Sequence, residues 1–314
     1  MSTASAPDAA VTCPVCGGAS VIVHKVQADG MRDALARLFG QPVPPAVELI
    51  DYNLRRCQDC TLEFATPMLP GNQAFYDWIT AAEKYTARKR WEWQVMADLI
   101  AVREQPVRVL ELGCGVGRFL EQLQELPAVT AVGIDSSATS VAAAKAKGLD
   151  VRLESVEATG ERGERFDVVV LSHLLEHVGD PLGLMRQVQA VLTPGGTIFC
   201  SLPYSPMSRE MPSLGVYDPM NLPPHHLTRW NASSFEALAK QLGMNVNLHS
   251  PKPKSVLKRT LNIVGESAGA SGSVARLAAS LSQPGRFMEV RRVLQSRDRI
   301  GGRRAGDVVL AVFG

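Results

Sequence analysis

Apolar and polar positions follow two patterns along the chain. One is a short, continuous apolar run, and the other is a longer stretch with apolar residues at every third or fourth position. The short runs are typical of strands buried on both faces, and the longer stretches of amphipathic helices. Helices are expected between the runs, and a sharp turn at 193–196. This order predicts an α/β protein with a doubly wound sheet. The seven predicted strands are residues 107–112, 129–134, 151–153, 166–172, 197–202, 244–249 and 308–313.

The first hundred residues follow a different pattern. A short helix is expected at 31–39 and a strand at 47–54. Residues 74–103 are predicted to be helical because apolar residues recur there at every third or fourth position. Pro106 ends this segment, so we expect a new domain to begin there.

Composition excludes several classes of protein. The chain is 46% hydrophobic and 20% charged, which excludes a disordered or collagen-like protein. No apolar run approaches the ~20 residues of a membrane-spanning helix. The first residues lack the positive charge and apolar core of a secretory signal. We therefore expect a soluble, cytoplasmic protein.

Charge is distributed unevenly along the chain. Residues 1–105 carry a net charge of −2, residues 106–250 carry −4, and the last 64 residues carry +8. An anionic partner would meet the basic end first. A solvated helical face is the simpler interpretation of the same charges.

Four of the six cysteines form two C-x-x-C pairs, Cys13/Cys16 and Cys57/Cys60. In a reducing compartment this pattern favours metal over disulfides, and two such turns complete a structural zinc site with four cysteine ligands. Forty residues separate the pairs, more than the usual ~15–20, and the predicted helix at 31–39 accounts for the excess. Redox-active or unrelated cysteines are the alternatives. The other two cysteines, Cys114 and Cys200, are expected to be buried.

A glycine-rich turn follows the first strand of the predicted sheet. Gly113, Gly115 and Gly117 alternate there, and glycines let a backbone turn tightly and approach a ligand. Asp135 ends the next strand, where a carboxylate can accept hydrogen bonds from ribose hydroxyls. Glu111 precedes the turn, at a position where a nicotinamide-binding fold needs no acid. Alone, the glycines would also fit a plain strand–helix turn.

Together, Glu111-Leu-Gly-Cys-Gly-Val-Gly117, Asp135, the Leu-Glu-His segment ending at His177 and Leu-Thr-Pro-Gly-Gly196 resemble class I S-adenosylmethionine-dependent methyltransferases. The resemblance implies a last strand antiparallel to the fifth, and a bound S-adenosylmethionine. The glycines would wrap its methionine part, Asp135 its ribose, and the Glu154–Ser155 region its adenine. The implied cofactor-site residues are Glu111, Gly113, Cys114, Gly115, Gly117, Asp135, Ser136, Glu154, Ser155, Ser172 and Tyr85.

The resemblance also divides the chain into four parts. Residues 1–73 form a zinc-ribbon-like module, and 74–105 form helices that cap the cofactor site. The methyltransferase domain comprises 106–250 and 305–314. Between these two stretches, 251–304 is a basic helical insert with short helices at 255–263 and 274–281 and a Gly/Ser/Ala-rich connection at 265–272. This insert is expected to be a lid, a homodimer contact or a docking patch.

Three histidines are candidates for activating the methyl acceptor. His225 and His226 lie in a long loop after the fifth strand, and long loops beyond strand ends often carry function. Histidine titrates near neutral pH, so either could act as general base. His173 follows the fourth strand, close to where such methyltransferases place donor and acceptor. Bracing of the loop is the structural alternative for each, and it is the expected role of His177.

The resemblance favours a small-molecule acceptor. Similar chains with an N-terminal zinc module methylate oxygen or carbon in sugars, nucleotide-linked sugars and natural-product intermediates. This chain lacks the large C-terminal domain of the sugar C-methyltransferases, which makes O-methylation at least as plausible. One alternative is a ribosomal or transfer RNA methyltransferase whose zinc module and basic tail bind RNA. A second is a catalytically silent cofactor-binding scaffold.

Overall fold

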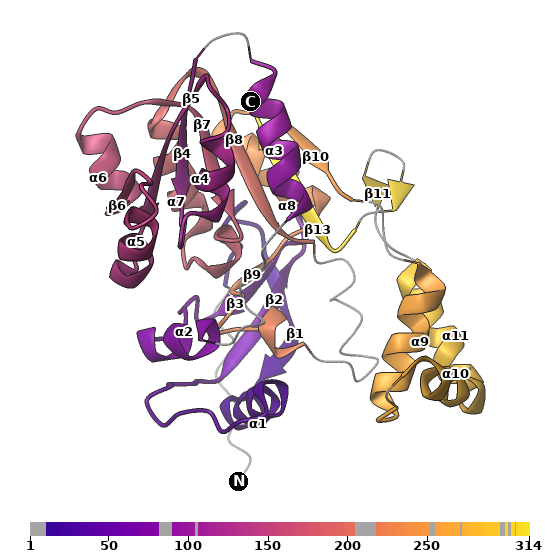
Figure 1. Cartoon of the computed structure of the whole chain (residues 1–314). Helices are drawn as coiled ribbons and strands as arrows, with labels where there is room; N and C mark the ends of the chain where they lie inside the picture. Colours follow the sequence, from indigo (N-terminus) through magenta and orange to yellow (C-terminus); the bar gives the residue numbers. More distant parts are fainter. Residues whose placement is uncertain are drawn as a thin grey trace.

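The computed structural model of the chain describes residues 11–81, 90–103, 106–204, 218–251, 255–270, 272–295, 299–300, 303–304 and 306–314. Its larger sheet has seven strands in the order β10-β13-β8-β7-β4-β5-β6 (Figure 1). All neighbours are parallel except β13, which is antiparallel to both β8 and β10. These strands are β4 (Val107–Leu112), β5 (Val129–Asp135), β6 (Val151–Leu153), β7 (Phe166–Ser172), β8 (Leu192–Pro203), β10 (Val246–His249) and β13 (Val308–Phe313).

Helices cover both faces of this sheet, because successive strand residues point to opposite sides. On one face, Val109 and Val168 pack with Met96 of α3 and Phe119 of α4. On the other face, strand residues such as Leu110 pack with residues of α6, α7 and α8. These helices and α5 are α3 (Trp91–Ala101), α4 (Arg118–Leu123), α5 (Ala138–Lys145), α6 (Val156–Glu161), α7 (Pro181–Ala190) and α8 (Ala232–Leu242).

A second sheet, of four strands, lies below the first in Figure 1. Its order is β1-β2-β3-β9, and all pairs are antiparallel. Three of its strands belong to the N-terminal region, but β9 (Thr228–Arg229) comes from the segment between β8 and α8. Strand β9 therefore joins the methyltransferase-like half of the chain to the N-terminal half. The other strands and the helices of this region are β1 (Ser20–Val26), β2 (Tyr52–Cys57), β3 (Glu63–Thr66), α1 (Ala28–Phe39) and α2 (Gln73–Thr80).

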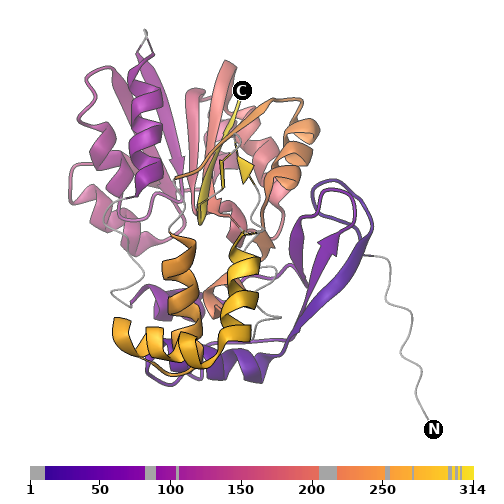
Figure 2. The same cartoon turned by 90° about the vertical axis from the view of Figure 1, so that its right-hand side faces the viewer.

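A group of three helices stands to one side of both sheets (Figures 1 and 2). These helices have a small core of their own, in which Val264, Val290 and Leu294 are buried together. They lie in the chain between β10 and β13, and the short hairpin of β11 and β12 follows them. The elements are α9 (Val256–Ser267), α10 (Ser273–Ser282), α11 (Pro284–Gln295), β11 (Arg299–Ile300) and β12 (Arg303–Arg304). Among the described helices, none combines the length and the apolar character needed to cross a bilayer.

Each of the seven predicted strands matches a strand of the large sheet, and the antiparallel last strand is confirmed. Three expectations were wrong in detail. The N-terminal strand begins at Tyr52, five residues later than predicted. The turn expected at 193–196 lies inside β8, where the pairing with β7 shifts between Phe166 and Val168. Helix α9 extends through Gly265 to Ser267, because the helix packs on α10 and α11 rather than ending in a loop.

Candidate functional site

The glycine turn lies at the carboxyl end of β4, in the middle of the large sheet. Gly113, Gly115 and Gly117 have φ angles of 67°, 54° and 75°, in the left-handed region that favours glycine. A side chain at Gly117 would collide with Leu149, because its Cβ would lie 2.2 Å from that residue's Cδ1. A Cβ at Gly115 would meet no atom within 4 Å, so the backbone there borders open space. The turn therefore presents bare backbone to a ligand.

Asp135 holds this turn in place from the end of β5. Its carboxylate accepts hydrogen bonds from the Gly115 N–H at 2.8 Å and from the Ser137 N–H, also at 2.8 Å. Both oxygens keep lone-pair capacity for a further donor. The structure thus brings the predicted ribose-binding carboxylate into direct contact with the predicted methionine-binding turn. Ser136, which lies between Asp135 and Ser137 in the chain, is exposed.

Glu111 is buried beneath the turn, with 3% of its surface exposed. Within the described residues its Oε2 makes no hydrogen bond. Burial, together with the nearby charge of Asp135, raises the pKa of Glu111 well above its usual value. A buried polar atom without a partner is costly, so a donor from a bound ligand would stabilise this site. Cys114 is buried beside it, as predicted, and burial raises the pKa of its thiol.

The residues predicted to meet adenine have local partners in the structure. Glu154 is paired with the Arg162 guanidinium through two contacts of 2.5 Å, and it also accepts a hydrogen bond from Thr159. Ser155 caps the first turn of α6 by accepting from the Ala158 N–H. Both lie at the carboxyl end of β6, on the same edge of the sheet as the glycine turn. Tyr85 lies outside the described residues.

The end of β7 carries Ser172 and His173. The Ser172 Oγ accepts a hydrogen bond from the Trp93 indole at 3.0 Å, which ties α3 to this strand end. His173 has a φ of 54°, and its Nε2 lies 3.0 Å from Glu92 Oε1. Its Nδ1 lies 3.4 Å from Glu176 Oε1. Burial disfavours the imidazolium, but these two carboxylates outweigh it and raise the pKa of His173.

His225 and His226 come together with a third histidine, His177. One ring nitrogen from each of the three lies within 4.8 Å of the others. The rings of His225 and His226 stack with centroids 4.5 Å apart, and His177 meets them edge-on at 4.6 and 4.9 Å. Burial and the charge of His177 lower the pKa of His225 to about 4, and burial lowers that of His226 well below its usual value. Both are therefore neutral imidazoles at neutral pH.

Sequence reasoning treated His177 as a loop-bracing residue and overlooked Glu92 and Trp93. His177 does brace the loop, because its Nδ1 lies 2.6 Å from the His225 carbonyl oxygen. It also completes the histidine cluster, which no local pattern could reveal because its partners lie 48 positions away or more. The spacing of Glu92 and Trp93 on α3 signalled only helix packing.

The four cysteines of the two C-x-x-C pairs meet at one end of the N-terminal sheet. All four sulfurs lie within 4.8 Å of one another, with Cys13 Sγ 3.6 Å from Cys60 Sγ and Cys16 Sγ 3.4 Å from Cys57 Sγ. Tetrahedral zinc with Zn–S bonds near 2.3 Å separates its sulfurs by about 3.8 Å. The hydrogen bond between the two thiols lowers the pKa of Cys13 and raises that of Cys60. This donor set could hold a metal ion.

Part of the chain is similar in sequence to curated methyltransferases. Curated relatives include the ubiquinone biosynthesis O-methyltransferase of Ruegeria sp. (strain TM1040), which is 32% identical over 150 residues, 44% of this chain and 60% of the relative. The enzyme of the same name from Ruegeria pomeroyi is 34% identical over 132 residues, 40% of this chain and 53% of the relative. The chain thus spans between half and two thirds of the length of these relatives.

The solved structures to which the chain is similar are more distant in sequence. A SAM-dependent methyltransferase from Archaeoglobus fulgidus is 15% identical with a TM-score of 0.47, over 76% of this chain and 99% of that one. The plantazolicin methyltransferase BpumL, solved with SAH, is 17% identical with a TM-score of 0.42, over 71% and 80% of the two chains. The family described as "Methyltransferase domain" matches residues 30–249, well over half of the chain. The protein belongs to this methyltransferase family.

Proposed function

We propose that the protein transfers the methyl group of S-adenosylmethionine to a small molecule, a sugar, a nucleotide-linked sugar or a natural-product intermediate. The observation that carries this proposal is the site at the carboxyl end of β4. There an open glycine turn, the Asp135 carboxylate and the unsatisfied Glu111 carboxyl meet. Family membership supports the same activity.

The residues of this site fit the cofactor. The bare backbone of Gly113 and Gly115 would lie along its methionine part, and Asp135 would accept from the ribose hydroxyls. Glu111 would meet a donor group, which relieves the unpartnered oxygen. The bound cofactor supplies a methyl group on a sulfonium, which is already electrophilic. The protein then has to align the acceptor and deal with its proton.

O-methylation is the favoured form of this reaction. The curated relatives are named O-methyltransferases, and a hydroxyl acceptor must lose a proton during transfer. The histidines at the end of β7 and in the loop after β8 are the groups that can take part in this loss. His225, His226 and His173 all remain candidates for the base. His173 is the weakest of these, because both of its ring nitrogens face carboxylates.

We further propose that Cys13, Cys16, Cys57 and Cys60 hold a structural zinc ion. The spacing of their sulfurs fits a closed tetrahedral shell, which leaves no position for chemistry. The ion would fix the start of β1 against the end of β2, where the cysteines lie.

The function is tested by two linked measurements. Binding of S-adenosylmethionine is measured by calorimetry, and transfer of its radiolabelled methyl group is followed into the small-molecule, lipid, protein and nucleic-acid pools of a cell extract. We expect label in the small-molecule pool, and we expect Asp135→Ala to abolish it by weakening cofactor binding. Asp150→Ala is the matched control, because Asp150 lies in the neighbouring turn with its side chain largely exposed.

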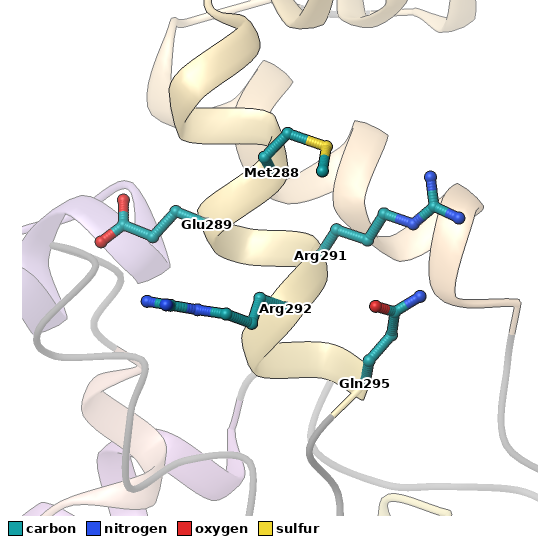
Figure 3. Close-up of a pocket in the computed structure, with 5 residues that line it drawn as sticks. All are labelled: Met288, Glu289, Arg291, Arg292 and Gln295. Atoms are coloured by element: carbon teal, nitrogen blue, oxygen red, sulfur yellow. The ribbon is translucent and has the colours of Figure 1, made fainter.

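Label in RNA would overturn the small-molecule proposal, and binding without any transfer would identify a silent scaffold. One observation favours the RNA alternative enough to test it. Helix α11 exposes Arg291 and Arg292 around a shallow hollow, seen in Figure 3. All residues that line this hollow belong to α11, and none belongs to the site at β4. The hollow would serve as a docking surface rather than as a place of reaction.

A further inference from the structure

The cluster of His177, His225 and His226 has a feature that packing alone does not require. Its members come from two separate segments: the 3-10 turn Leu175–His177 after β7, and the loop before β9. One nitrogen of each ring nevertheless reaches within 4.8 Å of the others. Three imidazoles that converge in this way form a donor set typical of transition-metal sites.

The hydrogen bonds of the three rings point to the same conclusion. In each ring Nδ1 faces an oxygen acceptor: the His225 carbonyl at 2.6 Å, the Met220 carbonyl at 2.8 Å and the Asn221 Oδ1 at 3.0 Å. An acceptor oxygen requires the proton on Nδ1, so the lone pair of each neutral ring is on Nε2. Histidine ligands of metals show this arrangement, because the outer hydrogen bond orients the ring and fixes its tautomer.

A buried carboxylate lies beside the cluster. Glu176 is 1% exposed, and neither of its oxygens makes a hydrogen bond within the described residues. Its Oε1 is 3.8 Å from His177 Nε2 and 3.4 Å from His173 Nδ1. A buried negative charge is costly unless a cation compensates it, and the imidazolium of His173 supplies part of that compensation. A metal ion on the three histidines would add positive charge at this place.

We propose that His177, His225 and His226 bind a divalent transition-metal ion of the zinc type through their Nε2 atoms. Imidazole ligands suit zinc, and Zn–N bonds of 2.0–2.1 Å require nitrogens about 3.4 Å apart. The ring nitrogens, which lie within 4.8 Å of one another without the ion, would have to move closer when it binds. Three protein ligands leave one position of a tetrahedral ion open, which distinguishes this site from the closed shell of four cysteines.

The site is close to the cofactor turn. Leu174, one residue before the 3-10 turn, packs against Gly113, where a Cβ would lie 3.2 Å from its Cδ1. If the proposed methyl transfer is correct, on which this step rests, the open position would bind the acceptor through its hydroxyl oxygen. His225 and His226 would then act as ligands rather than as bases. The ion would lower the pKa of the hydroxyl, so its proton passes to water. The oxygen lone pair then forms the bond to the methyl carbon while the carbon–sulfur bond breaks and the sulfonium becomes a thioether.

The test is the metal content of the full chain after equilibration with zinc and removal of free ions, measured by mass spectrometry. We expect two zinc equivalents in the wild type, one in Cys60→Ser, and one in His177→Gln and His226→Gln. His249→Gln should keep two, because His249 lies on β10 outside the cluster. Circular dichroism checks that each variant is folded.

A wild-type chain that binds only one zinc, and a Cys60→Ser chain that binds none, would overturn the proposal without relying on any histidine variant. A second zinc that persists in His177→Gln and His226→Gln would do the same. Calorimetry with S-adenosylmethionine shows whether the methyltransferase proposal holds even if the metal proposal fails. The histidine variants should retain cofactor binding, since the predicted cofactor residues lie at β4 and β5. Loss of cofactor binding in Asp135→Ala tests the methyltransferase proposal alone.

Discussion

Gly115 and Gly148 have similar backbone conformations but lie in different places. Their φ angles are 54° and 80°, and a Cβ at either would meet no atom within 4 Å. Gly115 belongs to the glycine turn that we propose to hold the cofactor, whereas Gly148 lies in the turn that follows α5. An added methyl group should therefore strain the backbone to a similar degree at the two positions. The two variants differ in where the methyl group lies relative to the proposed cofactor site.

Gly115→Ala should weaken binding of S-adenosylmethionine about tenfold or more, because the new Cβ would enter the space that the cofactor occupies. Both Gly115→Ala and Gly148→Ala should lower the free energy of unfolding by about 1 kcal/mol, since both force alanine into the left-handed region. Calorimetric titration and urea unfolding measure the two effects. Equal cofactor affinity in the two variants would show that the turn does not contact the cofactor.

His173 gives the protein a pH dependence of stability with a definite sign. Its pKa is raised in the folded state, so its contribution is complete below about pH 6.5, the unfolded value, and is lost as pH rises through the folded value. Glu92→Gln removes one of the two carboxylates that raise this pKa. The variant should therefore lose less stability than the wild type above about pH 6.5.

Urea unfolding at about pH 6 and about pH 9 measures this difference. The control is Glu121→Gln, which removes an exposed carboxylate paired with Lys147 and should keep the wild-type dependence. If Glu92→Gln loses as much free energy of unfolding as the wild type between these two pH values, Glu92 does not hold the proton on His173.

At the residue scale the sequence predicted contacts within one local motif and missed contacts between distant segments. The contact between Asp135 and the glycine turn could be predicted because strand ends in a parallel sheet meet at one edge. His177 could not be assigned to the histidine cluster, since its partners arrive on another loop. Glu154 was predicted to face a ligand, but Arg162, eight residues on, is its ion-pair partner.

Among the elements, β9 is held to β3 by more than backbone pairing. Arg229 donates a hydrogen bond to Glu63, and both side chains are buried, with 3% and 0% exposed. Arg56 also donates to Glu63, from the neighbouring strand β2. Breaking a buried ion pair is expensive because one charge is left without compensation.

Glu63→Gln should lower the free energy of unfolding by about 3 kcal/mol, as measured by urea denaturation. Glu289→Gln is the comparison, because its ion pair with Arg286 is partly exposed on α11 and should cost less than about 1 kcal/mol. A loss in Glu63→Gln no larger than in Glu289→Gln would show that the Arg229 pair does not hold β9 in place.

The elements of the large sheet could be predicted because each buried strand is a compact apolar run between helices. Strand β9 has only two residues, and its partner β3 lies more than 160 positions earlier. The hydrophobic periodicity of the sequence therefore cannot predict this strand. Helix α11 was not predicted either. Its apolar residues Phe287, Val290 and Leu294 pack on α9, but arginines interrupt the pattern along the sequence.

For the whole molecule, the three helices α9–α11 form a basic body apart from the site at β4 (Figure 2). Replacing Arg291 and Arg292 together by alanine should leave cofactor affinity and transfer to small molecules within about twofold of wild type, because these residues lie on an exposed face of α11. Calorimetry and the radiolabel assay measure both quantities. A fall in label incorporated into RNA, relieved at low salt, would instead favour the RNA alternative.

The pairing of β9 with β3 also bears on how such a protein can be divided or recombined. The histidines at 225 and 226 immediately precede a strand whose only sheet neighbour within the described residues is in the N-terminal region. A chain shortened to begin at residue 74 would leave β9 without its sheet partner β3, and the histidine loop would lose one of the contacts that hold it. Exchange of the N-terminal module between relatives would have to carry the segment around residues 218–231 with it. The structural unit is therefore assembled from two stretches that lie far apart in the chain.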